Sequence, residues 1–254
     1  MQLFDSHAHL TSNKFDNDRA GIIDKIIGRN MKVIDCSCEE ADFENVLANS
    51  NNAGIYSTYG VHPHEAKDVS KNYLKNIEQF SKDKKCVAIG EIGLDYHYEF
   101  SDRATQKKVL IEQLELAQSL NLPVVLHDRE SHSDMYEILN RFKGKLKGVM
   151  HCFSGGIGLV KPCLDLGLYI GFTGVITFDK SKKANDALAA VPNDKILIET
   201  DSPYMAPTPF RGKRNNPLLV EYVCEQGAKI KNLSKEDFAK ITTDNALKLF
   251  NINN

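Results

Sequence analysis

Histidines and carboxylates end short apolar runs at five places along this chain. The segments that carry them are Asp5-Ser6-His7-Ala8-His9, Glu91, His127, His151 and Glu199-Thr200-Asp201. Imidazole nitrogens and carboxylate oxygens are common protein ligands of divalent cations. If each run is a strand of one sheet, the polar residues at the strand ends gather at one rim. The pattern therefore predicts a metal-dependent hydrolase.

These side chains are more numerous than one cation needs. A catalytic zinc site uses three protein ligands and a water, whereas this chain offers four histidines and two carboxylates. His7 and His9 are two residues apart, so on an extended segment both point to the same face. A buried carboxylate such as Glu91 is costly unless a cation or proton satisfies it. We therefore predict two cations that share a carboxylate and activate a water for attack at phosphorus, although each residue alone could be an ordinary core or rim side chain.

The elements that must position these residues alternate along the chain. Apolar runs lie at 2–5, 32–36, 56–60, 87–91, 124–127, 148–151, 169–172 and 196–199. Amphipathic spacing predicts helices over 18–29, 41–50, 72–80, 103–120, 133–142, 157–166, 218–231 and 235–250. This order predicts an α/β protein, a closed (β/α)₈ TIM barrel formed as a single domain over residues 1–254. An open doubly wound sheet is the alternative, but no Gly-rich phosphate loop follows the first run.

Composition excludes several other classes of protein. The chain has 254 residues, of which 42% are hydrophobic and 26% charged, as in ordinary soluble globular proteins. No apolar stretch has the length of a membrane span, and no signal peptide is evident, so we expect no membrane partner and a cytoplasmic location. The net charge of −2 gives no global attraction to nucleic acid, so a polyanionic substrate would need a local basic patch.

The six cysteines show no paired CxxC spacing, and we expect them to be reduced. Cys36 and Cys38 could bind a soft metal. The simpler interpretation is that Cys36, at the end of an apolar run, is a small buried residue.

Six segments, in order along the whole chain, resemble the TatD family of metal-dependent deoxyribonucleases. They are DSHAHL (5–10), GVHPH (60–64), GEIGLDY (90–96), ETDSPY (199–204), RGKRN (211–215) and TDNA (243–246). The resemblance implies a TIM-barrel hydrolase of the amidohydrolase superfamily that cleaves DNA phosphodiester bonds, typically from the 3′ end of single strands. Single-stranded DNA or another nucleic acid is then the expected substrate, and we expect a monomer.

The resemblance also implies a role for each polar residue. It assigns one metal to His7, His9, Glu91 and Asp201 and the second to Glu91, His127 and His151. Asp201 would also accept a proton, which makes it catalytic together with Glu91. His62 would approach the substrate phosphate, and Arg129 and Arg211 are candidates for further phosphate contacts. Mg²⁺ or Mn²⁺ are the expected cations, and the histidines are also compatible with Zn²⁺.

Two positions depart from the patterns of the superfamily and the family. No lysine ends the fourth run to form a carbamylated bridge, so the encoded carboxylate of Glu91 would take that place. After His127, Arg129 stands between Asp128 and Glu130. The arginine is available for a phosphate, but it can equally pair with either neighbour at the surface.

Cations and aromatic side chains follow several runs and would lie near the same rim. The cations are Lys180, Lys182, Lys183, Arg211, Lys213 and Arg214, all expected in loops. The aromatic residues are Tyr96, Tyr98, Phe100, Tyr204 and Phe210. The cations could follow a phosphate backbone and the rings could stack on unpaired bases. Solvated surface and loop packing are the simpler interpretations.

Two functions other than a nuclease stay open from the sequence. The same cations could serve an ester or amide hydrolase, such as a D-aminoacyl-tRNA deacylase, which would turn over esters faster than DNA. The chain could also be a non-catalytic binding protein that retains the ligands as relics, although the complete ligand set argues against this.

Overall fold

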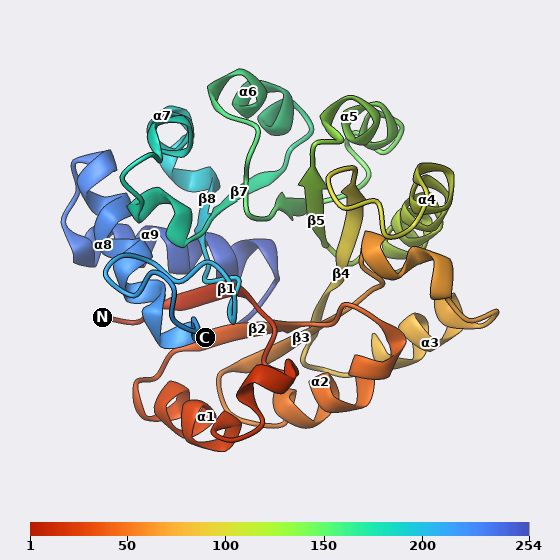
Figure 1. Ribbon diagram of the computed structural model, residues 1–254, viewed down its shortest axis with the longest axis horizontal. Coiled ribbons are helices and arrows are strands. Elements are labelled where there is room, and N and C mark those ends of the chain that lie inside the picture. Colours follow the sequence, from red (N-terminus) through yellow and green to blue (C-terminus); the bar gives the residue numbers. More distant parts are fainter. Residues whose placement is uncertain (254) are drawn as a thin grey trace.

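Eight parallel strands follow one another around a barrel in chain order (Figure 1). The computed structural model describes residues 1–253, so Asn254, the last residue of the predicted domain, lies outside the described part. The strands are β1 (Phe4–Ala8), β2 (Lys32–Cys36), β3 (Ile55–Tyr59), β4 (Cys86–Asp95), β5 (Val124–Arg129), β6 (Gly148–Met150), β7 (Tyr169–Phe172) and β8 (Ile196–Ile198). An isolated parallel bridge between Ala8 and Ser202 joins the last strand region to the first, so the barrel is nearly closed. The predicted TIM barrel is confirmed.

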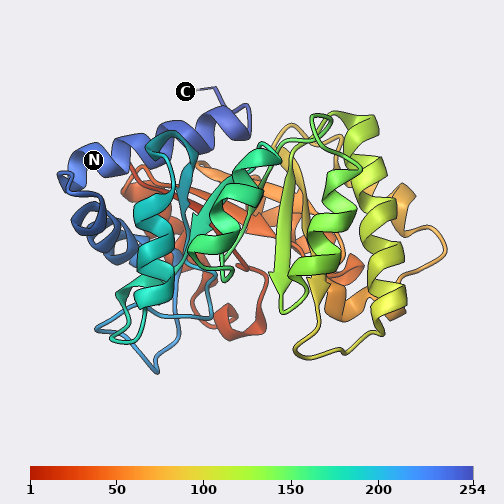
Figure 2. The same cartoon turned by 90° about the horizontal axis from the view of Figure 1, so that it is seen from above.

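Helices surround the strands (Figures 1 and 2). They are α1 (Arg19–Gly28), α2 (Phe43–Ser50), α3 (Tyr73–Phe80), α4 (Arg103–Leu120), α5 (His132–Asn140), α6 (Ile157–Asp165), α7 (Lys182–Ala190), α8 (Val220–Lys231) and α9 (Lys235–Leu249). In α4 the residues at helical spacing, Leu110, Leu114 and Ala117, are buried as expected. None of the helices in the described part of the chain is long and apolar enough to cross a membrane.

The amino-terminal end of the barrel is closed by α9, which crosses it in Figure 2. Leu247 and Phe250 pack against Phe4, Val125 and Leu197 from the starts of strands in one buried apolar cluster. Most other core side chains form a second cluster, which includes residues of the helices and of the strands. Because the amino-terminal end is filled with apolar side chains, polar chemistry is left to the carboxyl ends of the strands.

The structure differs from the sequence-based prediction most clearly in four elements. Helix α7 was not predicted, because its sequence KKANDALAA consists of alanines and polar residues around a single large apolar residue, Leu188. Lys182 and Lys183 therefore lie in its first turn and not in a loop. Strands β1, β4 and β5 run three, four and two residues past the predicted ends, and β4 and β5 remain paired there, with Gly93 opposite His127. Asp95 at the end of β4 is buried, and Asp128 and Arg129 at the end of β5 are half-buried, so a change from apolar to polar residues does not mark these strand ends.

Candidate metal centre

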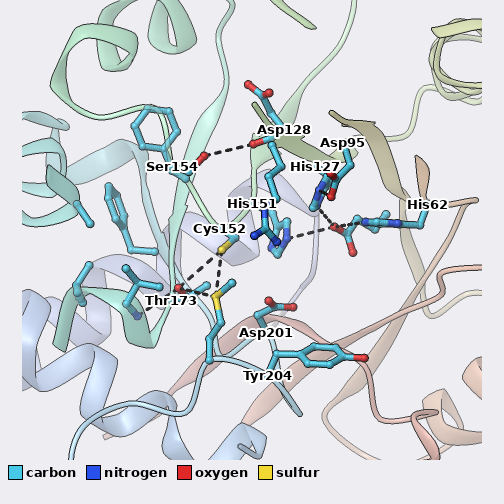
Figure 3. A pocket seen from close by; sticks show the side chains of 18 of the residues that line it. His62, Asp95, His127, Asp128, His151, Cys152, Ser154, Thr173, Asp201 and Tyr204 are labelled. Atoms are coloured by element: carbon cyan, nitrogen blue, oxygen red, sulfur yellow. Dashed lines mark hydrogen bonds and ion pairs between the residues drawn. The ribbon is translucent and has the colours of Figure 1, made fainter. Parts of the chain in front are cut away.

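The six predicted ligands converge at the carboxyl-terminal rim of the barrel. His7, His9, Glu91, His151 and Asp201 are buried, and His127 is largely covered. Figure 3 shows His62, His127, His151 and Asp201 directed into one cavity from different sides. Residues separated by up to 194 positions in the sequence thus share one small space because their strands end side by side.

Glu91 lies between two sets of side chains and presents one carboxylate oxygen to each. Its Oε2 atom is 3.3 Å from Nε2 of His7 and 3.6 Å from Nε2 of His9. Its Oε1 atom is 2.8 Å from Nδ1 of His127 and 3.2 Å from Nε2 of His151. This is the geometry of a carboxylate that can bridge two cations.

The set that faces Oε2 is completed by Asp201. Its Oδ1 atom is 3.8 Å from Nε2 of His7 and 3.4 Å from Nε2 of His9, and these two nitrogens are 3.1 Å apart. Ligand atoms about 2.1 Å from a tetrahedral cation lie roughly 3.4 Å from one another. The observed separations therefore suit a divalent cation.

The set that faces Oε1 contains a third imidazole besides those of His127 and His151. Nε2 of His62 is 3.5 Å from Oε1 of Glu91. The backbone N–H of His64 donates to Nδ1 of His62 at 3.2 Å. Because Nδ1 accepts a hydrogen bond, neutral His62 carries its proton on Nε2 and directs an N–H group into the cavity.

Two further carboxylates hold the imidazoles from behind. Nδ1 of His151 is 3.0 Å from Oε1 of Glu199, and Nε2 of His127 is 3.2 Å from Oδ2 of Asp95. Both carboxylates are fully buried. Such partners fix the ring orientation and decide which nitrogen faces the centre. His127 accordingly presents Nδ1, whereas His151 presents Nε2.

Hydrogen bonds between the first and last strand regions place Asp201. Asp5 on β1 accepts from the backbone N–H and the hydroxyl of Thr200 at 2.8 and 2.6 Å. The N–H of Asp201 donates to the carbonyl of His7 at 2.9 Å. Asp201 itself has φ of +53°, a left-handed conformation that acidic residues tolerate better than bulky ones. The turn directs its carboxylate toward the histidines of β1.

Burial and charge oppose one another at the acidic ligands. Burial by itself raises the pKa of the Glu91 carboxyl. The neighbouring imidazoles, that of His151 first among them, outweigh this effect and hold the pKa well below its usual range. Burial also raises the pKa of Asp201, but the hydrogen bond from His9 and the neighbouring imidazoles outweigh it, so the pKa is lowered. Both carboxylates are therefore ionised at neutral pH.

The pKa values of the imidazoles are shifted in both directions. Burial lowers the pKa of His7 and His62, and the nearby carboxylates do not fully compensate. For His151, the carboxylates of Glu91 and Glu199 outweigh burial and raise the pKa well above its usual range. The pKa of His9 is also raised well above its usual range, against burial, by the acidic groups around it. Positive charge at the centre thus balances the buried carboxylates, and a divalent cation can supply it.

All six cysteines are free, as the sequence predicted. Cys36 is buried; its carbonyl oxygen lies 3.0 Å from Nδ1 of His9 and its Sγ atom 3.5 Å from Nδ1 of His7. Sγ of Cys38 is 3.5 Å from the same nitrogen of His9. The two thiols therefore support the histidines from behind.

The arginines expected to contact substrate occupy different environments. Arg129 lines the cavity, with its guanidinium 4.7 Å from the ring centre of Tyr98. Asp128 pairs with His132 and Glu130 with His97, so the alternative in which Arg129 pairs with one of these neighbours is not observed. Arg211 lies 3.6 Å from the ring centre of Phe178 and is outside the residues that line the cavity.

The remaining cations and aromatic residues also separate into two groups. Lys180, Lys183, Tyr98 and Tyr204 line the cavity. Of the others, Lys182 contacts Asp186, Arg214 contacts Asp18, Tyr96 contacts Asp134 and Phe210 contacts Tyr222. Phe100 stacks on Tyr98, and Lys213 is exposed. The cavity has a volume of about 870 Å³, within the range of roughly 300–1,000 Å³ that is common for ligand sites.

Two buried carboxylates of the site were given no role from the sequence, Asp95 and Glu199. Asp95 is four residues after Glu91, and the period of two along a strand puts both on one face. Glu199 stands two residues before Asp201. The spacing was therefore a usable signal, but only the tertiary contacts show which imidazole each carboxylate holds.

Comparison with known proteins agrees with this geometry. Residues 4–251 match the model of the TatD-related DNase family. The chain is 38% identical to YabD of Bacillus subtilis, described as an uncharacterized metal-dependent hydrolase, over 99% of this chain and 100% of that protein. It is 34% identical to the 3′-5′ ssDNA/RNA exonuclease TatD of Erwinia tasmaniensis, over 98% of this chain and 100% of that enzyme. The crystal structure of YjjV, a TatD homologue of Escherichia coli, superposes with a TM-score of 0.90 at 30% identity, over 99% of this chain and 98% of that one. The chain belongs to the TatD-related DNase family of metal-dependent hydrolases.

Proposed function

We propose that this protein hydrolyses phosphodiester bonds at the 3′ end of single-stranded DNA with two divalent cations. The observation that carries the proposal is the position of Glu91, whose two oxygens face two separate sets of imidazoles. A two-cation site suits displacement at phosphorus, because the attacking and leaving oxygens can both be stabilised. The names of similar exonucleases support the same substrate class.

The residues present fit such cations. His7, His9, Asp201 and Oε2 of Glu91 would hold one, and His127, His151 and Oε1 of Glu91 would hold the other. Bound there, the cations would lower the pKa of a water and reduce the negative charge on the phosphoryl oxygens. We propose Mg²⁺ or Mn²⁺ as the working cations, and the imidazole-rich donor set also suits Zn²⁺. Since all ligands come from one chain, we expect the monomer to suffice.

Asp201 is the proton acceptor in this proposal. Its carboxylate lines the cavity, and its lowered pKa keeps it ionised at neutral pH. A carboxylate at that position can take the proton from an attacking water.

His62 has a different part in the proposal, because it is neutral and offers an N–H group. Burial lowers its pKa well below the usual range, and the bond from His64 reserves Nδ1 as an acceptor. The Nε2–H group can therefore donate to a phosphoryl oxygen next to Glu91. A neutral donor suits this position, since it adds no charge that would repel a cation.

A matrix of cations against substrates tests the proposed function. The protein is stripped with chelator and reloaded with Mg²⁺, Mn²⁺ or Zn²⁺, then given single-stranded DNA, duplex DNA, RNA or aminoacyl-tRNA. We expect nucleotides to be released fastest from single-stranded DNA, with no release after chelation or in Glu91→Ala. Faster turnover of aminoacyl-tRNA than of DNA would overturn the proposal in favour of an ester hydrolase.

A further inference from the structure

The cavity extends beyond the metal centre into a space between the segments that follow β6 and β7. We call this space the side lobe and define it by Phe153, Val175, Ile176, Lys180 and Lys183, which line it. In Figure 3, Ser154 and Thr173 lie on this side of His151, whereas His62 lies on the opposite side. The side lobe is thus continuous with the candidate centre but contains none of its proposed ligands.

Several contacts build the walls of the side lobe. Gly156 has φ of +70°, and a Cβ atom there would lie 2.7 Å from Cε of Lys183. The aliphatic part of the Lys183 side chain therefore packs directly against the backbone of this glycine. The hydroxyl of Ser181 donates to the carbonyl of Ile176 at 3.2 Å. The backbone N–H of Thr208, in the segment after β8, donates to the hydroxyl of Thr177 at 2.8 Å. These bonds hold the segment after β7 in place before any ligand arrives.

The side lobe combines an apolar lining with unpaired positive charge. Phe153 and Ile176 are buried, and Val175 is half-buried. Among the described residues no carboxylate lies within ion-pair distance of Lys180 or Lys183, in contrast to the pairs that many exposed lysines make here.

Lys182 shows the contrast within one helical turn. Its ammonium pairs with Asp186 at 2.6 Å and it does not line the cavity. The adjacent Lys183 turns the other way, over Gly156. Two free cations above an apolar surface are complementary to a ligand that has both a ring system and a phosphate.

We propose that the side lobe binds the terminal unpaired nucleoside of a nucleic-acid strand, with its base against Phe153, Val175 and Ile176. Lys180 and Lys183 then contact the phosphates that flank this nucleoside. The inference rests on the proposed function and deepens it, because it assigns the part of the substrate that the enzyme reads.

The chemistry of the side lobe favours this occupant over the other substrates considered. A base within a duplex must be unstacked and unpaired before it can enter, at a cost of a few kcal/mol, whereas an unpaired base enters without that cost. The α-ammonium group of an aminoacyl ester would be repelled by the two lysines. The side lobe thus provides a physical reason for a single-strand preference.

Two probes separate binding in the side lobe from binding at the cations. Thymidine 5′-monophosphate carries a base and a phosphate, and inorganic phosphate carries only the latter. We expect the Mn²⁺-loaded protein to bind the nucleotide more tightly. In Val175→Phe, which fills the side lobe, the nucleotide should lose about 5- to 150-fold in affinity, the range of one base–aromatic or apolar stacking contact, while inorganic phosphate binds as before.

Circular dichroism shows whether Val175→Phe is folded. If it is not, Lys183 and Lys182 supply a second variant and its control. Lys183→Ala should reduce by about one the slope of log affinity for single-stranded DNA against log salt, as expected for one lost phosphate contact. Lys182→Ala is the matched control and should leave the slope unchanged. DNA affinity is measured with Ca²⁺ in place of the working cation if Mn²⁺ supports cleavage.

The outcomes distinguish this inference from the proposed function. If wild-type protein cleaves single-stranded DNA but a folded Val175→Phe keeps the wild-type ratio of nucleotide to phosphate affinity, the side-lobe assignment is overturned and the proposed function stands. An unchanged salt slope in Lys183→Ala overturns the proposed phosphate contact. If the nucleotide binds as expected and no DNA is cleaved with any cation, the proposed function fails and the side lobe remains a nucleotide site.

Discussion

Replacement of Glu199 tests whether the buried carboxylate behind His151 controls metal binding. Oε1 of Glu199 accepts from Nδ1 of His151 at 3.0 Å and from the backbone N–H of Cys152 at 2.6 Å. Oε2 accepts from the hydroxyl of Ser6 at 3.1 Å, and this hydroxyl also lies 3.2 Å from the carbonyl of Ile198. In Glu199→Gln, the amide oxygen can keep both N–H bonds, and Ser6 can accept from the new NH₂ group while donating to Ile198. The variant therefore removes charge and leaves the hydrogen-bonding pattern intact.

The expected loss follows from the difference between charged and neutral hydrogen bonds. A bond to a charged group contributes about 1.5–3 kcal/mol, against about 0.5–1.5 kcal/mol for a neutral one. A loss of about 1–1.5 kcal/mol corresponds to roughly tenfold weaker binding of Mn²⁺, at the low end of the effects of such partners. Glu199→Ala removes the acceptor altogether. Two buried N–H groups are then unsatisfied, at about 1–3 kcal/mol each, so metal affinity and stability should both fall further.

Isothermal titration calorimetry of Mn²⁺ into chelator-stripped protein measures this loss. Glu225→Gln is the matched control, since it makes the same change at an exposed carboxylate whose partner is Lys229. Wild-type affinity in Glu199→Gln would refute the claim that this carboxylate orients His151 for a cation.

The same titration has a pH dependence with a definite sign. Glu91 and Glu199 raise the pKa of His151 against the effect of burial, so below that pKa a cation must displace a proton. Glu199→Gln lowers the pKa and weakens this competition. The affinity deficit of the variant should therefore be smaller at pH 6 than at pH 9. An equal deficit at both pH values would contradict the assigned role of the charge.

Two further substitutions, one of them with a matched control, test the environment of the centre. Burial raises the pKa of Asp35 to about 7 although Asn49 and a backbone N–H donate to it; the folded chain then holds a proton that the unfolded chain has released, and stability falls as the pH rises from about 4 to 7. Asp35→Asn should flatten this part of the curve of Tm against pH in chelator, and an unchanged curve would contradict the assignment. A Cβ atom at Gly171 would lie 2.7 Å from Oε2 of Glu199, so Gly171→Ala should lower both Tm and Mn²⁺ affinity. Gly158, on α6, is the control, because a Cβ atom there meets nothing within 4 Å. Gly158→Ala should stabilise the fold by up to about 1 kcal/mol and so raise Tm slightly. Equal effects of Gly171→Ala and Gly158→Ala would refute the steric argument.

Local patterns in the sequence were sufficient to predict the barrel and the convergence of the candidate ligands at one rim. Runs of Val, Ile and Leu mark strands that are buried on both faces, and a parallel sheet needs helices between them. Because such strands all end at one rim, polar residues after the runs had to meet, and His7, His9, Glu91, His127, His151 and Asp201 do so. Helix α7 was missed because its sequence offers only one large apolar residue, Leu188, among alanines and polar residues.

Contacts between distant strands decided the rest. Glu199 holds His151 across 48 residues, and Asp95 holds His127 across 32; no local pattern encodes which imidazole each carboxylate reaches. Lys182 and Lys183 are adjacent and chemically identical, yet the orientation of α7 places only Lys183 in the cavity. The sequence by itself determines which apolar runs become strands of the barrel, since this depends on local hydrophobicity. Which polar atoms pair, and which cations stay free, depends on strand register and helix orientation, which only the tertiary structure decides.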